Sequence, residues 1–162
     1  MAIEPCRFCT TIISGGQTGV DRAALDFALQ RGYPHAGYCP PGRMAEDGAI
    51  PPRYLLQELE TGGYRQRTKR NVQESDGTLI LSPGECEGGT LATLQFALRF
   101  GKPHHVVDLA VESTPAQLQQ TLEWIRQHQI ERLNVAGPRE ERCPGVYQSA
   151  LDYLLRLDLV RG

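Results

Sequence analysis

The stretch SGGQTGVD, residues 14–21, joins two apolar segments through three glycines. The segment before it, Thr10 to Ser14, is short and β-branched, which predicts a buried strand. The segment after it, Val20 to Arg31, predicts a helix that ends at Gly32. The expected buried face of that helix consists of Val20, Ala23, Ala24, Phe27 and Ala28. A strand, a glycine loop and a helix in this order are typical of α/β proteins.

Strand and helix patterns go on alternating along the chain. Further strands are expected at residues 34–38, 77–82, 104–109 and 132–136. Further helices are expected at residues 64–74, at 90–100, from Thr114 and Pro115 onward, and at 146–159. Residues 39–52 predict a long loop, and residues 54–60 one or two helical turns. The alternation predicts a doubly wound α/β fold: a mainly parallel sheet of five or more strands with helices on both faces.

Length and composition restrict the class of protein. A chain of 162 residues, 40% hydrophobic and 22% charged, fits one folded domain, with residues 1–9 as an N-terminal arm. The formal net charge of -2 gives no sign of a nucleic-acid binder. No apolar stretch has the length of a membrane span, and the N-terminus does not resemble a secretory signal. We therefore expect a cytoplasmic protein that does not bind membranes.

The first glycine loop has the features of an anion site. Backbone amides at a helix start lack partners within the helix, and the helix dipole adds roughly half a positive charge there. Gly15, Gly16 and Gly19 would let a phosphate approach the backbone, while Gln17 and Thr18 could add side-chain donors. The loop matches neither the P-loop nor the dinucleotide motif, and the same glycines would suit a plain turn.

Two more glycine loops follow predicted strands. Residues 83–90 end in Gly88, Gly89 and Thr90, where Thr90 is a candidate N-cap. Residues 136–145 contain Gly137 and Arg139, and an arginine beside such a loop suits phosphate contact. Because the carboxyl ends of parallel strands share one edge of the sheet, we expect all three loops there.

Charged residues outside these loops could complete the site. In the polar helix at 64–74, Arg67 and Asn71 share a face that would either turn toward the loops or be solvated. In the long loop, Arg43 could hold phosphate. Glu46 and Asp47 could bond a ring, ligate a metal or act as general base, or only add solubility. Asp21 in the first helical turn would complement the helix dipole.

The cysteine pattern does not predict a disulfide framework, a redox site or a metal site. Five cysteines at irregular spacing do not predict a disulfide framework. Cys6 and Cys9 form a C-x-x-C pair, but no second pair follows, and the pair precedes the first strand. No histidine pair has metal-ligand spacing, so we predict no metal site. A redox or metal module around Cys6 and Cys9 is a weaker alternative.

Several stretches together resemble a known family. They are SGGQTGVDRAALDFAL, CPPGRMAEDGAIP, YRQRTKRNVQESDGTLIL, EGGTLATLQFALRFGKP and LNVAGPREERCPGVY. Over about Thr10 to Leu155 they resemble the molybdenum-cofactor carrier family, which is related to YpsA in the circularly permuted branch of the SLOG superfamily. The resemblance implies a Rossmann-like sheet, a pocket for a nucleotide-like or pterin-phosphate ligand, and a homo-oligomer.

A related branch of that superfamily contains phosphoribohydrolases with the signature P-G-G-x-G-T-x-x-E. Here the matching stretch begins at Gly89, and Thr93 stands where the catalytic glutamate would be. A hydroxyl cannot replace that carboxylate in acid–base chemistry. The resemblance therefore favours a carrier of molybdenum cofactor, or of another phosphate-bearing ligand, that delivers it to molybdoenzymes. A nucleotide-processing hydrolase that uses Glu46, Asp47 or Glu87 is the alternative.

Overall fold

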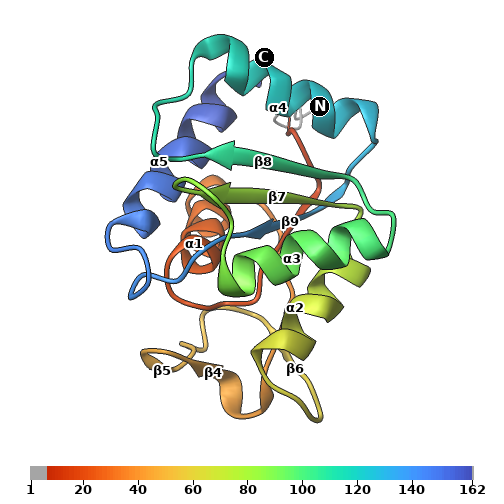
Figure 1. The fold of residues 1–162 in the computed structure, drawn as a ribbon, viewed down its shortest axis with the longest axis vertical. Coiled ribbons are helices and arrows are strands. Elements are labelled where there is room, and N and C mark those ends of the chain that lie inside the picture. The colour runs from red at the N-terminus through yellow and green to blue at the C-terminus, as the bar shows by residue number, and fades with distance from the viewer. Residues whose placement is uncertain (1–6, 162) are drawn as a thin grey trace, which may run out of the picture.

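The computed structural model describes residues 7–161 and contains the predicted parallel sheet (Figure 1). Its five strands lie in the order β2-β1-β9-β7-β8, and every neighbouring pair is parallel. They are β1 (Thr11–Ile13), β2 (His35–Ala36), β7 (Gly77–Ser82), β8 (His104–Asp108) and β9 (Arg132–Ala136). Every residue of β7 is buried, as expected of a strand with helices on both of its faces.

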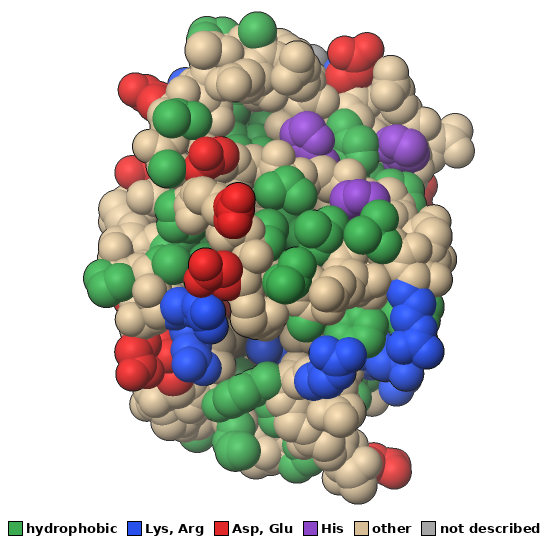
Figure 2. Space-filling view, in the orientation of Figure 1, with side chains coloured by type: hydrophobic (Ala, Val, Ile, Leu, Met, Phe, Trp, Pro, Cys, Tyr) green, Lys and Arg blue, Asp and Glu red, His purple; other side chains and the backbone are tan. Residues whose placement is uncertain are grey.

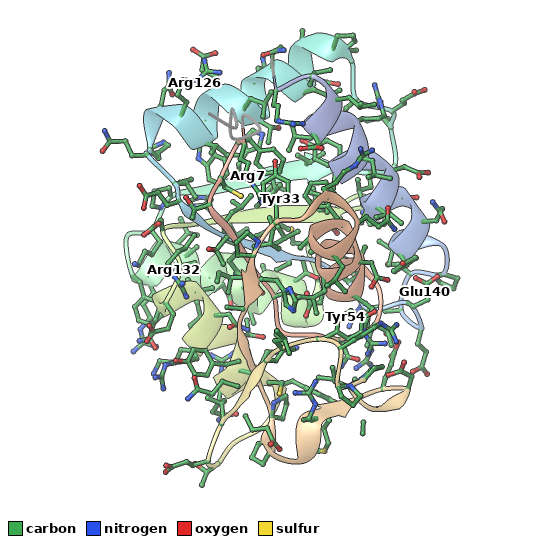
Figure 3. The ribbon with its side chains drawn as sticks, turned by 180° about the vertical axis from the view of Figure 1, so that it is seen from behind. Arg7, Tyr33, Tyr54, Arg126, Arg132 and Glu140 are labelled. Atoms are coloured by element: carbon green, nitrogen blue, oxygen red, sulfur yellow. The ribbon has the colours of Figure 1, made fainter. Side chains whose placement is uncertain are left out.

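Helices cover both faces of this sheet, so the doubly wound prediction is confirmed. On the face that is nearer in Figure 1 lie α2 (Tyr64–Gln73) and α3 (Gly88–Arg99). On the opposite face, seen in Figure 3, lie α1 (Val20–Arg31), α4 (Pro115–Gln127) and α5 (Val146–Leu159). In the described part of the chain, no helix combines the length and the apolar character needed to cross a membrane.

The main core lies between the sheet and the helices α1, α4 and α5. All five residues predicted for the buried face of α1 are fully buried in it. Gly32 ends α1 in the left-handed conformation, with φ 69°. Thr114 caps α4, and its hydroxyl accepts a hydrogen bond from the amide of Gln117 at 3.2 Å. These sequence signals were sufficient because each is local to its own helix.

The prediction for residues 54–60 is wrong. This stretch is extended and contains β6 (Gln57–Glu58), which pairs in parallel with β3 (Tyr38–Cys39). Tyr54 is fully buried, and its hydroxyl donates to Asp26 Oδ1 at 2.5 Å. These tertiary contacts outweigh the helical preference of the local sequence. The strand predicted at 34–38 is divided as well. Its first part, β2, pairs with β1 in the main sheet, and β3 pairs with β6 outside that sheet.

Residues 38–60, called here the 38–60 segment, form a separate layer beyond one end of the sheet (Figure 1). The segment contains the short helix η1 (Pro41–Arg43) and a hairpin of β4 (Met44–Ala45) and β5 (Gly48–Ala49), which the sequence predicted only as a loop. The Arg43 guanidinium donates to the backbone carbonyls of Ile50, Pro51, Tyr54 and Leu56 at 2.7–3.3 Å. Arg43 therefore holds the segment together.

Helix α3 begins two residues earlier than predicted. Gly88 is its first residue, and Glu87 occupies the N-cap position. Thr90 lies inside the first turn, where its amide donates to the Glu87 carbonyl at 3.0 Å. The prediction that Thr90 caps this helix is therefore wrong. The shift places both Gly88 and Gly89 in the helix, with their amides at its amino terminus.

Candidate functional site

A cavity of about 210 Å³ lies at the carboxyl edge of β1, β7 and β9. All three glycine loops line it, which confirms the prediction that they share one edge. They contribute Gly15 and Gln17, then Gly89 and Thr90, then Gly137 and Arg139. Figure 2 shows a hollow on this face, with Lys or Arg side chains on both sides and another recessed between them. The cavity is thus bordered by positive charge.

Most backbone amides of the first glycine loop already donate hydrogen bonds to acceptors within the protein. The amides of Gly16, Gln17 and Thr18 donate to Ser14 Oγ, Asp21 Oδ2 and Gln17 Oε1 at 3.0–3.3 Å. The amide of Val20 donates to the carbonyl of Pro138 at 3.2 Å. These four amides are not free for an anion, contrary to the prediction. The sequence could not show this, because the acceptors include two side chains of the same loop.

Gly19 serves loop packing rather than a ligand. A Cβ at this position would collide with the carbonyl oxygen of Pro138 and approach the amide of Glu140. The adjacent Thr18 hydroxyl accepts from the Glu140 amide at 3.2 Å and donates to the carboxylate of Glu46. Gly16, Thr18 and Gly19 are not among the residues that line the cavity. Their place in the structure is the junction of the first and third loops.

The amino terminus of α3 is different because its first amides are unused. Glu87 at the N-cap makes no side-chain capping hydrogen bond. Among the described residues, none accepts a hydrogen bond from the amide of Gly88 or Gly89. A Cβ on Gly89 would meet nothing within 4 Å, so this glycine faces open space. Two free amides at the positive end of a helix dipole form an anion-binding position.

Two arginines border the cavity near this helix end. Arg139 pairs with Glu46, with Nε 3.3 Å from Oε2, and Arg142 pairs with Glu87, with Nη2 3.4 Å from Oε2. Both arginine side chains are 44% exposed. The Arg142–Glu87 pair is exposed on both sides and contributes little to stability, so the Arg142 guanidinium can turn to an incoming anion at small cost. Arg139 is held more firmly, because its partner Glu46 is only 14% exposed.

The inner wall of the cavity carries a buried ion pair. Arg67 Nη1 lies 3.3 Å from Asp21 Oδ2 and donates to the carbonyl of Gly15 at 3.2 Å. Burial raises the pKa of Asp21 to about 6, against the opposing effects of the Arg67 charge, the Gln17 amide and Arg22. Arg67 thus lines the cavity as predicted. Asp21, interpreted from the sequence only as a dipole partner, lines it too.

Two asparagines line the cavity in different ways. The side chain of Asn71 is fully used, because it accepts from the Tyr38 amide at 2.8 Å and donates to the Tyr38 carbonyl at 3.0 Å. Asn71 therefore fixes β3 against α2. Asn134, on the central strand β9, is 3% exposed, and its Nδ2 donates to Thr78 Oγ1 at 3.2 Å. The sequence analysis missed Asn134, although a polar residue in a buried strand just before a glycine loop was a usable signal.

Three further candidates do not line the cavity: Arg43, Glu46 and Asp47. Asp47 pairs with Arg22 at 3.0 Å, and this contact holds the pKa of its carboxyl below the ordinary value. Burial would raise the pKa of Glu46, but hydrogen bonds from Thr18 and Glu141 lower it overall. Glu46 thus joins the 38–60 segment to the first and third loops, and Asp47 joins it to α1.

The cysteine and metal alternatives gain no support. Within residues 7–161, no group of three His, Cys, Asp or Glu side chains could hold a metal ion. Cys9 is buried, and burial raises the pKa of its thiol to about 12, which disfavours thiolate chemistry. Cys6 lies outside the described residues, so the geometry of the C-x-x-C pair stays untested.

These features define a class: a Rossmann-like α/β protein with a polar cavity at the carboxyl edge of a parallel sheet, where such folds bind ligands. The model of the circularly permutated YpsA SLOG family matches residues 12–157, and the chain belongs to that family. A crystal structure at 1.45 Å from Syntrophus aciditrophicus SB, named "Putative molybdenum carrier protein", is 46% identical. The match covers 93% of this chain and 95% of that one, with a TM-score of 0.88. None of the curated proteins compared with the chain matches it.

Proposed function

We propose that this protein binds and carries a small phosphate-bearing ligand, with molybdenum cofactor as the first candidate. The observation that carries the proposal is the amino terminus of α3, where Gly89 lines the cavity and the amides of Gly88 and Gly89 are free. An anion placed there gains both hydrogen bonds and the helix dipole. Arg139 and Arg142 add two guanidinium groups, which suit bidentate contact with phosphate. The name of the 46% identical relative supports the choice of cofactor.

The residues of the cavity fit the phosphate and the polar ring of molybdenum cofactor. The α3 amides and the two arginines would hold the phosphate. Asp21 and Asn134 offer acceptors for ring N–H groups, and the dithiolene of the cofactor itself would keep its metal. Pockets for drug-sized ligands usually measure about 300–1,000 Å³. The cavity of about 210 Å³ would therefore enclose only part of the cofactor.

The residues that line the cavity offer few groups for the acid–base catalysis that a hydrolase needs. The carboxylates that line it are Asp21 and Glu87, whereas Glu46 and Asp47 are engaged elsewhere. Thr93, at the position of the family glutamate, donates its hydroxyl hydrogen to the carbonyl of Gly89 at 3.0 Å. This contact fixes the first turn of α3 and supplies no acid or base. We therefore favour carriage over turnover, in the cytoplasm, with molybdoenzymes as recipients and with a homo-oligomer as the assembly.

A charge placed on the α3 terminus tests the proposal. We expect Gly89→Asp to weaken binding of GMP and of ribose 5-phosphate at least tenfold in isothermal titration calorimetry, because its carboxylate repels phosphate and occupies the amides. Gly63→Asp is the matched control: it adds the same charge at the N-cap of α2, at a position that does not line the cavity. Equal affinity for wild type and Gly89→Asp would refute the phosphate position. Hydrolysis of GMP during the titration would favour the enzyme instead.

A further inference from the structure

The inner end of the cavity holds polar atoms that the protein itself leaves without partners. Asp21 uses Oδ2 for the Gln17 amide and for Arg67, while Oδ1 has no donor among the described residues. Asn134 uses Nδ2 for Thr78, and its Oδ1 has no donor among residues 7–161. The two residues are 8% and 3% exposed, and both line the cavity. Each oxygen is an acceptor whose direction is fixed by the other half of its own side chain.

A donor accompanies these acceptors. Arg67 uses Nε for the Tyr64 carbonyl at 3.4 Å and Nη1 for Gly15 and Asp21. In the described part of the chain, no group accepts from Nη2. The Arg67 side chain is 10% exposed, and Arg67 lines the cavity. None of these three atoms is sealed from solvent, so each stays available at the cavity wall for a hydrogen bond with a ligand.

The fixed positions favour one kind of ligand group. Arg67 and Asp21 are held against each other at 3.3 Å, so the cavity presents a donor and an acceptor in a set order. An amino-oxo ring edge, as in guanine or a pterin, presents two adjacent N–H donors beside a carbonyl acceptor. Sugar hydroxyls donate and accept equally and need no set order. A cavity of about 210 Å³ has room for one ring system but not for a whole nucleotide.

We propose that the cavity recognises an amino-oxo ring, with Asp21 Oδ1 and Asn134 Oδ1 accepting from its N–H groups and Arg67 Nη2 donating to its carbonyl. This inference rests on the proposed function, because the ring enters first and its phosphate stays at the mouth. Gly88 and Gly89 are exposed at that mouth, as the arrangement requires. The shared edge of guanine and pterin is the recognised chemistry.

Three phosphate ligands separate this inference from the phosphate proposal. GMP, IMP and ribose 5-phosphate would be titrated calorimetrically into the full-length chain. IMP lacks only the 2-amino group of GMP, and a buried hydrogen bond to a charged acceptor is worth roughly a tenfold difference in affinity or more. We expect GMP to bind at least tenfold tighter than IMP. Equal binding of GMP and IMP would overturn the ring inference alone, and no binding of any phosphate ligand would overturn both proposals.

Substitutions of the inner residues test which side chains cause the preference for GMP over IMP. Asp21→Asn should bring the GMP-to-IMP affinity ratio close to one, and urea denaturation of the same variant shows that it is folded. Asn134→Ser, which removes the acceptor Asn134 Oδ1, should lower the GMP-to-IMP affinity ratio by a smaller factor. Gly89→Asp should weaken GMP and IMP alike and keep the ratio. A ratio unaffected by both inner variants would overturn the inference. Titration with guanosine and 6-hydroxymethylpterin would show which ring is the better fit.

Discussion

At the scale of single residues, the site depends on side chains whose hydrogen bonds the sequence does not display. Gln17 accepts from the amides of Thr18 and Glu46, so it holds the first loop to the 38–60 segment. Arg43 was a candidate phosphate ligand and is instead the centre of that segment. A guanidinium looks the same in a sequence whether it meets four carbonyls of its own chain or a bound anion. Only the folded chain distinguishes the two.

Asp21 should leave a signature in the pH dependence of stability. Its folded-state pKa is about 6, above the ordinary 3.8. Its contribution to the free energy of unfolding is therefore present below about pH 4 and is lost as the pH rises through 6. Relative to Asp21→Asn, the wild type should lose on the order of 3 kcal/mol between these limits. Urea denaturation of both proteins across this range measures it, and a difference that stays constant or grows with pH would contradict the shift.

Arg43→Ala should lower stability without affecting the ligand. The change leaves four backbone carbonyls without their donor, and we expect a loss of about 2–3 kcal/mol in the free energy of unfolding. Limited proteolysis should then cut within residues 38–60. Arg53→Ala, which removes one hydrogen bond from the Arg53 guanidinium to the Tyr54 hydroxyl at 2.9 Å, is the comparison and should cost less. A selective loss of GMP affinity with unchanged stability would restore Arg43 as a phosphate ligand.

At the scale of elements, each of the three glycine loops leads into a helix at this edge, and among the described residues α3 is the one of these three helices whose first amides have no acceptor. At the start of α1, the amides of Val20 and Arg22 donate to the carbonyls of Pro138 and Gln17. At α5 the Glu140 carboxylate accepts from the amides of Gly145 and Tyr147 at 2.6 and 2.9 Å. At α3 no side chain plays this part. The amino terminus of α5 is therefore occupied by the Glu140 carboxylate of the same chain, whereas the amino terminus of α3 is left for the anion of a ligand.

This comparison makes a prediction for α5. Glu140→Ala removes the capping carboxylate and should lower the free energy of unfolding by about 1–2 kcal/mol, the usual cost of a lost cap with its dipole contribution. Thermal or urea denaturation measures the loss. Glu85→Ala, at an exposed position in the second loop, serves as the control and should change stability by less than about 0.5 kcal/mol. Equal effects of the two changes would show that Glu140 is not a cap.

At the scale of the whole molecule, the sequence predicted the layers better than the contacts. Hydrophobic periodicity and glycine stops are local, so they located the five main strands, the helices and the edge where the loops meet. Residues 54–60 were mispredicted because β3 and buried Tyr54 impose an extended conformation from outside the stretch. All three loops line the cavity as predicted, but the sequence did not show that most amides of the first loop are bonded, because which amides stay free depends on acceptors placed by the fold. The sequence also does not display that Asp21 and Asn134 each use one side-chain atom inside the fold, Oδ2 and Nδ2 respectively, and keep the other at the cavity wall.

The most direct test of the account is an amide NMR titration of the ¹⁵N-labelled protein with GMP. The account predicts that the amide resonances of Gly88 and Gly89 shift most and move downfield, because these two N–H groups donate to the phosphate. The amides of Gly16 and Thr18, already bonded within the first loop, should shift less. Largest shifts at Gly16 and Thr18, with Gly88 and Gly89 unchanged, would contradict the central claim that the α3 terminus holds the phosphate.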